Sequence, residues 1–301
     1  MPLTFIIEVT ISGELIANKK AHQMTVKLKL LRSVVGLWSS VTPKLAGGWL
    51  ATKFLTVRPA FRNPPEEFLH PAATRLKIND EIEAWRYGPQ SEVSTKTALL
   101  VHGWEGRRSQ FSEIIPALLN QGYDVICLDP PMHGSSEGKA SNPVLFGDAV
   151  LAAGEKFGRI ELVVGHSLGG VGVVLAMERG LEADQYVLIS TPSKLVTVLK
   201  GVAEMVGFSG AATRAFVEEI GRRVGTSPEK LDLSLKVALR KEPALFIHDK
   251  GDRNVPFDPS WGTCSAWPGA IRLETSGFGH NRILVAPEVV TAIAKFAGKM
   301  S

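Results

Sequence analysis

The sequence has only two cysteines, Cys127 and Cys264, among its 301 residues. They form neither a C-x-x-C pair nor any spacing typical of zinc ligands, so we expect no disulfide framework and no structural zinc site. This sparse cysteine usage favours a reducing compartment. We therefore expect a cytoplasmic protein whose two thiols lie in its core or its loops.

The sequence also lacks an uncharged apolar run long enough to cross a bilayer, which takes about 20 residues. The longest uncharged run in the first third of the chain, residues 33–43, is far too short. The first 20 residues place their lysines after the apolar part and contain no small-residue cleavage site. We therefore expect neither a transmembrane helix nor a secretory signal.

Acidic residues are scarce at the start of the chain. Residues 1–62 contain nine Lys and Arg against Glu8 and Glu14, whereas the whole chain has a formal net charge of only +4. Such a basic arm can approach nucleic acid or an anionic membrane. Its basic residues are spread singly and are not interleaved with stacking aromatics, so we expect no nucleic-acid partner. A solvated helix face is the simpler interpretation.

Apolar periodicity predicts helices within this basic region. From residue 27 onward one stripe recurs at helical spacing, formed by Leu31, Val34, Val35, Trp38, Val41 and Leu45. Pro43 is expected to break or kink the helix, and a second amphipathic piece follows at 49–55. We expect these helices to pack on the core or to cover its functional site, with contact to a membrane surface or a dimer partner as the alternative. Residues 1–23 are interpreted as a short strand pair, and residues 59–71 as an extended, proline-rich connection.

From residue 74 onward, strand and helix patterns alternate. A predicted hairpin, 74–78 and 82–87, is followed by apolar strands at 98–101, 124–128, 160–164, 185–189, 244–248 and 271–274. Helical patterns at 109–120, 144–157, 168–179 and 287–297 follow or separate these strands. Strands joined by helices of this length call for right-handed crossovers. The sequence therefore predicts an α/β fold with a doubly wound, mostly parallel sheet.

The alternation is interrupted once. About fifty residues, 193–241, contain only helical patterns, which predicts a helical cap inserted into the α/β core. The expected organisation is an N-terminal helical extension over 1–73, a core made of 74–192 and 242–301, and the cap between the two core segments.

One serine lies in a motif with a chemical interpretation. Residues 165–169 read Gly-His-Ser-Leu-Gly, which fits G-x-S-x-G between an apolar strand and an apolar helix. In a sharp strand-to-helix turn the serine backbone is strained, and glycines remove the Cβ atoms that would clash where strand and helix nearly touch. We therefore interpret Ser167 as a nucleophile at the start of a helix. A glycine-rich turn without chemical meaning is the alternative.

An alcohol is a poor nucleophile at neutral pH, so Ser167 needs a base within hydrogen-bond reach and a third group that orients the base. In a doubly wound sheet these partners are expected on loops that follow strands. His280, in a glycine-flanked loop after the last strand, is the predicted base. Asp252 is the predicted acid, with Asp249 as its rival and Glu274 as a weaker candidate.

Acyl transfer builds negative charge on a carbonyl oxygen, and donors aimed at that oxygen supply much of the catalysis. The amide of Leu168, directly after the nucleophile, is one predicted donor. The amide of Trp104 is the other, in the His-Gly-Trp-Glu-Gly loop after the first strand that follows the hairpin. The alternative is that this loop merely turns the chain. Glu105 is unusual beside a developing negative charge, and we expect it to point away or to pair with Arg107 or Arg108.

Five motifs together resemble those of bacterial α/β-hydrolases of the serine esterase type: HGWEGR (102–107), D-x-P-x-H-G-x-S (129–136), GHSLGG (165–170), HDxxDxxVP (248–256) and GHNRIL (279–284). The resemblance runs from about Leu28 to the C-terminus and implies the α/β-hydrolase fold, in which nucleophile, acid and base follow in that order. It also implies that the loop with Asp129 and His133 orders the active-site edge of the sheet. We therefore interpret His133 as structural.

These features predict a serine hydrolase that cleaves a carboxylic ester through an acyl-enzyme, without a metal or an organic cofactor. Ser167 attacks, His280 moves the proton, Asp252 orients His280, and the amides of Trp104 and Leu168 hold the oxyanion. A thioesterase, amidase or peptidase is the alternative because all pass through the same tetrahedral intermediate. A binding protein with a vestigial triad is a further alternative. The sequence does not indicate the oligomeric state.

The predicted cap bears on the substrate. One stripe of its helical pattern is apolar, formed by Leu195, Val198, Leu199, Val202, Met205 and Val206. A helix with such a stripe must bury it, and for an inserted cap we expect the mouth of the catalytic pocket to be the available surface. The predicted partner is therefore a small-molecule ester with an apolar acyl group. The alternative is that the stripe only packs the cap against the core.

Overall fold

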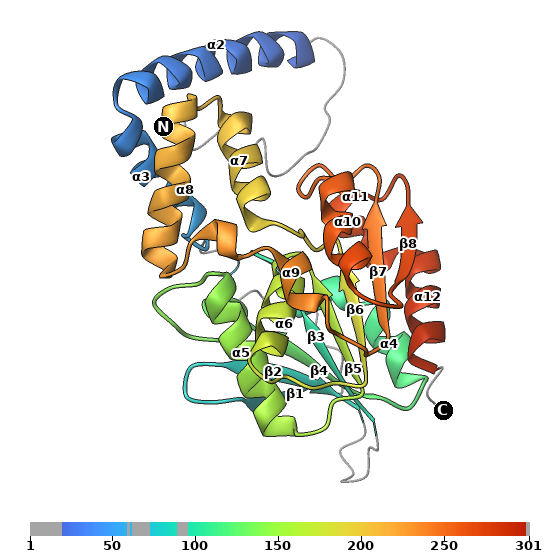
Figure 1. Cartoon of the computed structure of the whole chain (residues 1–301). Coiled ribbons are helices and arrows are strands. Elements are labelled where there is room, and N and C mark those ends of the chain that lie inside the picture. Colours follow the sequence, from blue (N-terminus) through green and yellow to red (C-terminus); the bar gives the residue numbers. More distant parts are fainter. Residues whose placement is uncertain (1–19, 59–60, 62–72, 89–95, 299–301) are drawn as a thin grey trace. The chain divides into compact units, whose positions relative to one another are not determined.

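The computed structural model describes residues 20–58, 61, 73–88 and 96–298 (Figure 1). The chain forms two compact units, a helical unit of Met1–Phe54 and Lys194–Leu231 and a sheet unit of Leu55–Ser193 and Asp232–Ser301. The strand pair expected within 1–23 falls mainly outside the described residues, and its last residues, 20–23, belong to a helix. Most of the connection expected at 59–71 also lies outside the described residues.

The sheet unit is built on one eight-stranded sheet with the order β1-β2-β4-β3-β5-β6-β7-β8. Its first two strands pair antiparallel with each other, and β2 pairs antiparallel with β4, whereas every later pair is parallel. The prediction of a mostly parallel sheet is confirmed. The strands are β1 Thr74–Lys77, β2 Glu83–Tyr87, β3 Thr97–Val101, β4 Asp124–Asp129, β5 Leu162–His166, β6 Gln185–Ile189, β7 Ala244–Asp249 and β8 Ile271–Thr275.

Helices cover both faces of this sheet, which is why its central strands are continuous apolar runs. Every residue of β4, β5, β6 and β7 is buried. Helices α5 (Pro143–Phe157) and α6 (Leu168–Glu178) pack together, and α4 (Ile114–Leu119) packs with α12 (Pro287–Ala297) (Figure 1). The helix predicted at 109–120 divides into a 3₁₀ turn, Arg108–Phe111, and α4. Pro116 accounts for the late start of α4, because proline fits only the first turn of an α-helix.

The helix α6 is buried on all sides. Every residue from Gly169 to Met177 is inaccessible or nearly so. Its backbone lies so close to α5 that a Cβ on Gly172 would come within 2.9 Å of the Cβ of Phe146. The helix that follows Ser167 is therefore held firmly between its neighbours.

The segment expected as a cap divides between the two units. Helices α7 (Leu195–Val206) and α8 (Gly210–Val224) and the turn Pro228–Lys230 belong to the helical unit, whereas α9 (Leu233–Val237) belongs to the sheet unit. The inserted part of the helical unit therefore ends at Leu231 and not at the expected residue 241. The reason is that α9 buries Leu233 and Val237 while it packs against α6 and α10 (Phe257–Ala266).

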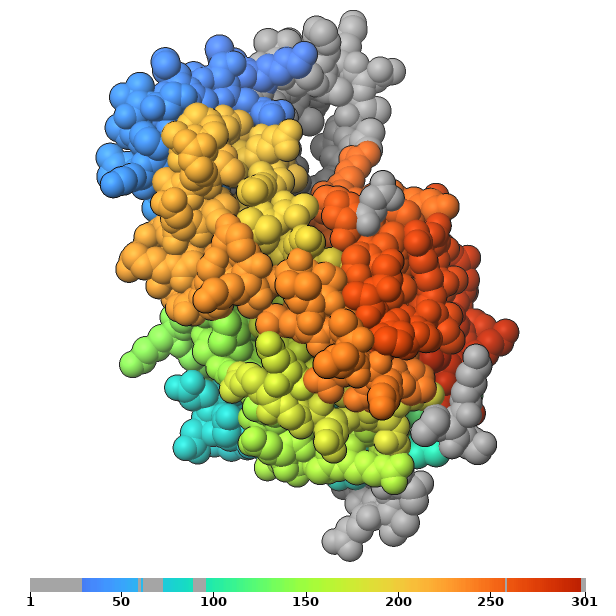
Figure 2. Space-filling model, in the orientation of Figure 1, coloured from blue at the N-terminus to red at the C-terminus, as the bar shows by residue number. Residues whose placement is uncertain are grey.

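The helical unit joins the start of the chain to the segment inserted after β6. Helices α2 (Lys20–Val41) and α3 (Pro43–Phe54) lie beside α7 and α8 (Figure 2). Pro43 is the first residue of α3, so it separates the two helices as expected. The closest contact joins α3 to α8, where a Cβ on Gly47 would lie 2.6 Å from the amide nitrogen of Phe216. Helices α2 and α3 therefore share one core with the inserted helices.

The apolar stripes predicted on α2 and α7 each divide into a buried and an exposed part. On α2, Val35 is 1% exposed, whereas Val34 and Val41 are 56% and 72% exposed. On α7, Leu195, Leu199 and Val206 are buried, whereas Val198, Val202 and Met205 are partly exposed. The interpretation of α2 as a helix with a single packed stripe is therefore wrong. In the described ranges no helix is long and apolar enough to span a membrane.

Candidate active site

Ser167 occupies a sharp turn between β5 and α6. Its backbone has φ +52° and ψ −120°, a region that side-chain-bearing residues rarely adopt, and its amide donates to the carbonyl of Ile189 at 2.9 Å. Strand and helix nearly touch at this turn. A Cβ on Gly165 would lie 2.6 Å from the Cα of Gly170, so glycine is required there. The turn therefore has the nucleophile-elbow geometry that the motif predicts.

Two residues from distant loops meet at this serine. The Nε2 atom of His280 lies 3.0 Å from the Oγ of Ser167, and the Nδ1 atom of His280 lies 2.7 Å from an oxygen of Asp252. Asp252 follows β7, and His280 lies in α11 (Gly279–Arg282), which follows β8. When Nδ1–H donates to the carboxylate, Nε2 is left as the acceptor that faces the serine hydroxyl. This is the arrangement in which a histidine can take the proton of an attacking serine.

Asp252 is buried and well supplied with donors. Its Oδ1 accepts from the amides of Asn254 and Val255, each at 2.9 Å, and its Oδ2 lies 3.4 Å from the Nε2 of His248. Burial alone would raise the pKa of this carboxyl, but hydrogen bonds with His248 and His280 hold the pKa well below its ordinary range. Asp252 is therefore a carboxylate at neutral pH and can stabilise positive charge on His280.

The rival acid, Asp249, makes different contacts. Its carboxylate accepts from the amides of Gly251 and Phe278, at 2.8 and 3.1 Å, and from the hydroxyl of Thr275 at 2.9 Å. Burial would raise its pKa, but these hydrogen bonds outweigh burial and lower it. Asp249 thus ties the loop after β7 to the loop after β8. Glu274 pairs with Lys250 at 3.0 Å and with Arg272, so the geometry brings only Asp252 to His280.

His166, which precedes the serine, contacts the loop that carries His280. This contact was not predicted from the sequence. The buried Nε2 of His166 lies 2.9 Å from the carbonyl oxygen of His280, and the two imidazole centroids are 4.8 Å apart. Burial, aided by the neighbouring His280, lowers the pKa of His166 to about 3. A neutral His166 must carry its proton on Nε2 to donate to that carbonyl. It therefore anchors the backbone of the loop that carries His280.

The two predicted oxyanion donors come from two different segments, the first turn of α6 and the loop that follows β3. Leu168 is the first residue of α6, and amides in the first turn of a helix have no acceptor within it. The loop with Trp104 passes close to the serine, because a Cβ on Gly103 would lie 2.9 Å from the Cβ of Ser167. Trp104 follows this contact directly, and its ring packs edge-on against His133 at 5.4 Å.

The side chain of His133 connects this loop to the loop after β4. Its Nε2 accepts from the amide of Glu105 at 2.9 Å, and its Nδ1 lies 2.9 Å from the carbonyl of Pro131. Nε2 acts as the acceptor, so the proton lies on Nδ1 and the ring joins two loops as a neutral imidazole. These contacts agree with the structural role that the resemblance implies for His133.

Comparison with known proteins places the arrangement in a family. A model of the alpha/beta hydrolase family matches residues 98–292, which is more than half of the chain. The chain belongs to the alpha/beta hydrolase family. A comparison with curated protein sequences found no match.

Solved structures share the fold of this alpha/beta hydrolase. An esterase of Pyrococcus furiosus is 21% identical with a TM-score of 0.56, over 74% of this chain and 90% of that one. Est1E of Butyrivibrio proteoclasticus, solved with ferulic acid bound, is 17% identical with a TM-score of 0.57, over 76% and 97%. A bromoperoxidase of Bacillus anthracis is 20% identical with a TM-score of 0.56, over 74% and 99%. At these identities the likeness shows the fold alone.

Glu105 of the hydrolase forms its ion pair with Arg58, so the pairing with Arg107 or Arg108, one of the two expected alternatives, is not found. Its carboxylate accepts from the backbone amide of Arg58 at 2.9 Å and from the guanidinium of the same residue at 2.8 Å. Arg108 instead stacks on the ring of Trp85, at 3.8 Å from its centroid. Because Glu105 is ion-paired, its negative charge is largely neutralised beside the oxyanion loop. The sequence could not reveal a partner 47 residues earlier in the chain.

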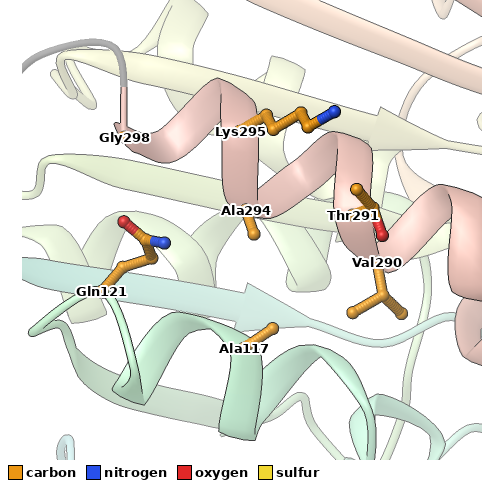
Figure 3. Close-up of a pocket in the computed structure, with 7 residues that line it drawn as sticks. All are labelled: Ala117, Gln121, Val290, Thr291, Ala294, Lys295 and Gly298. Carbon is orange, nitrogen blue, oxygen red and sulfur yellow. The ribbon is translucent and has the colours of Figure 1, made fainter.

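A groove outside this site lies between α4 and α12 of the hydrolase (Figure 3). It measures about 400 Å³, and its lining carries a single charged residue: Ala117, Gln121, Val290, Thr291, Ala294, Lys295 and Gly298. Its lining contains no serine, cysteine, histidine or carboxylate, so it offers no nucleophile paired with a base as at Ser167. Among the described residues, no group of three or more His, Cys, Asp or Glu is arranged to hold a metal ion.

Proposed function

We propose that this alpha/beta hydrolase cleaves a carboxylic ester through an acyl-enzyme formed on Ser167. The observation that carries the proposal is the pair of hydrogen bonds that connects Ser167 to His280 and His280 to Asp252, at 3.0 and 2.7 Å. A nucleophile, a base and an orienting acid in contact are the parts that serine acyl transfer needs.

In the proposed first half-reaction, the Oγ of Ser167 attacks the ester carbonyl carbon while its proton passes to the Nε2 of His280. Asp252 stabilises the imidazolium. The amides of Trp104 and Leu168 donate hydrogen bonds to the tetrahedral oxyanion and stabilise its negative charge. When the carbonyl re-forms, the bond to the alcohol breaks. The alkoxide leaves with the proton from Nε2, and the acyl group stays on Ser167.

The second half-reaction repeats these steps with water. His280 accepts a proton from water as its oxygen attacks the acyl carbon, and the same two amides hold the second oxyanion. Collapse of this intermediate breaks the bond to Ser167, which recovers its proton from Nε2. The carboxylic acid is then released. In this scheme the side chains and water transfer every proton, so no metal or organic cofactor is needed.

Several observations favour an ester as the substrate. Solved structures with this fold include two esterases, one of them bound to ferulic acid, and a putative lipase of Acinetobacter baumannii. We further propose a small-molecule ester with an apolar acyl group. Thioesters, amides and peptides are the second choice, because the same residues would serve their tetrahedral intermediates.

The test combines a fluorophosphonate probe with p-nitrophenyl esters of graded acyl length, run beside thioesters and amides. We expect the probe to label Ser167 and the highest kcat/KM to fall among the esters. Ser167→Ala should remove labelling and lower kcat at least ~10³-fold at an unchanged Tm. Ser190→Ala is the matched control, because Ser190 is also a positive-φ serine directly after a central strand. A correctly folded protein that neither reacts with the probe nor turns over any ester would refute the proposal in favour of a binding protein.

A further inference from the structure

The helix α2 has a second apolar face that the helical unit leaves uncovered. Its large apolar residues recur at spacings of four, three and four, which places them on one side of the helix. Leu45, in the first turn of α3, continues the row. We call this set the outer stripe, and each member is more than half exposed: Leu30 (67%), Val34 (56%), Leu37 (71%), Val41 (72%) and Leu45 (70%).

The packed face of α2 lies on the other side. Val35 and Ser39 are buried, and the Ser39 hydroxyl accepts from the amide of Ser209 at 3.0 Å. At 3.6 residues per turn, the centre of the outer stripe lies nearly half a turn away from these two residues. The outer stripe therefore contributes nothing to the core of the helical unit.

The surroundings of the outer stripe carry charge of one sign. Helices α2 and α3 contain six Lys and Arg, and no Asp or Glu occurs between Glu14 and Glu66. Lys29 and Lys44, in the described part of these helices, are exposed, whereas Arg32 lies on the packed side of α2 and donates to the carbonyl of Glu204 at 3.0 Å. Exposed apolar residues beside unopposed cations are the composition of helices that lie in the interface of anionic bilayers.

A second copy of the chain fits this surface poorly. The stripe on α2 runs from Leu30 to Val41, less than two heptads, whereas a coiled coil needs about three or more. Pairing two such helices would also bring Lys29 and Lys44 of one copy near those of the other, with no acidic residue on either helix to offset them.

We propose that α2 binds parallel to the surface of an anionic phospholipid bilayer. The outer stripe enters the boundary between headgroups and acyl chains, and the lysines of α2 and α3 contact lipid phosphates. With 22 residues, α2 is roughly 33 Å long, so it presents its stripe over the breadth of several headgroups. This contact is independent of the proposed ester hydrolysis.

The test uses the full chain and co-sedimentation with two kinds of vesicle, equimolar phosphatidylglycerol and phosphatidylcholine, or phosphatidylcholine alone. We expect partitioning to the anionic vesicles that weakens as salt is added. Leu37→Glu combined with Val41→Glu should reduce the partition coefficient roughly 100-fold or more. The control pair, Leu235→Glu with Leu239→Glu, replaces leucines of the sheet unit that are even more exposed and should leave binding unchanged.

A second double variant, Lys29→Gln with Lys44→Gln, should reduce partitioning about 30-fold at low salt, at a contribution of about fivefold for each cation. Hydrolysis of a soluble ester should be equal in all of these variants, which separates failure of this proposal from failure of the proposed function. Unchanged hydrolysis with lost binding is the expected pattern.

Three results would overturn the proposal. The first is that the unaltered chain does not bind anionic vesicles, or that the variant Leu37→Glu with Val41→Glu binds them as well as the unaltered chain does. The second is a dimer in light scattering that the same variant dissociates, which would identify a second copy as the occupant. The third is slow maleimide labelling of Val34→Cys without vesicles, which would show that the chain itself covers the stripe. Cys127 and Cys264 are buried and should contribute little background.

Discussion

The two units of this hydrolase differ in how completely they bury their apolar helices. In the sheet unit, α6 is apolar around its whole circumference, and every residue from Gly169 to Met177 is buried. In the helical unit, α2 also has apolar residues on two sides, but only the side with Val35 is covered. An apolar face that supports the fold is buried, so the exposed outer stripe of α2 contributes little to stability. Substitutions in the two units should therefore have separable effects.

The largest expected difference lies inside the sheet unit, between two of its buried aspartates. Asp252→Asn should lower kcat about 10³-fold to 10⁴-fold, because an amide at this position favours the wrong tautomer of His280. Asp249→Asn should act chiefly on stability, because Asp249 accepts from Gly251, Thr275 and Phe278 and does not contact His280. Ester hydrolysis and urea denaturation of both variants test this. Equal losses of kcat at equal stability would mean that the acid is not Asp252.

Adjacent glycines of α3 test how tightly the helical unit is packed. A Cβ on Gly47 would lie 2.6 Å from the amide nitrogen of Phe216, whereas a Cβ on Gly48 would meet nothing within 4 Å. Gly47→Ala should therefore lower the free energy of unfolding by about 1–3 kcal/mol, since α3 and α8 must move apart. Gly48→Ala should raise it by up to about 1 kcal/mol through better helix propensity. Circular dichroism during denaturation measures the free energy of unfolding of both variants. A Gly47→Ala variant as stable as Gly48→Ala would show that α3 does not pack on α8.

Two neighbouring valines of α2 lie on different faces, so substitutions there distinguish the packed face from the outer stripe most directly. Val35→Ala should cost about 2 kcal/mol, because it removes buried methyl groups and leaves a cavity. Val34→Ala should change the free energy of unfolding by no more than about 0.5 kcal/mol, because Val34 is more than half exposed. The same denaturation experiment compares them. Equal losses would mean that the outer stripe is covered within the unit.

The smallest expected effect is on the pH dependence of stability. The pKa of Asp252 is lowered in the folded chain by hydrogen bonds with His248 and His280, which outweigh the effect of burial, while an unfolded aspartate titrates near 3.9. The folded state therefore binds fewer protons at acidic pH, so its stability is full above about pH 5 and falls as the pH drops below about 4. In Asp252→Asn the decline should be shallower. Urea midpoints measured from pH 6 down to pH 3 would show this, and an unaltered slope would contradict it.

Most of the sheet could be predicted from the sequence. Its central strands carry apolar runs of three or four residues, and helices separate them, so strand positions could be predicted to within two residues. The motif around Ser167 was equally informative, because its glycines are needed where Gly165 approaches Gly170. Local patterns of this kind depend only on residues that are close in the chain.

Other features depend on contacts that no local pattern records. The choice between Asp249 and Asp252 depends on Thr275 and Phe278, which reach Asp249 from the loop after β8. The helix α10 was not predicted, because Pro259 and Gly262 interrupt its pattern. Periodicity also placed apolar residues of α2 on one stripe without showing which of them other helices would cover.

The left-handed backbone at Ser167 has one further consequence. Every residue with a Cβ atom is strained at φ +52°, and only glycine would relax that strain. Position 167 is therefore one at which selection for stability alone would replace the serine with glycine. Under the proposed function, a hydroxyl kept there against that tendency is a compromise between a stable turn and a reactive one.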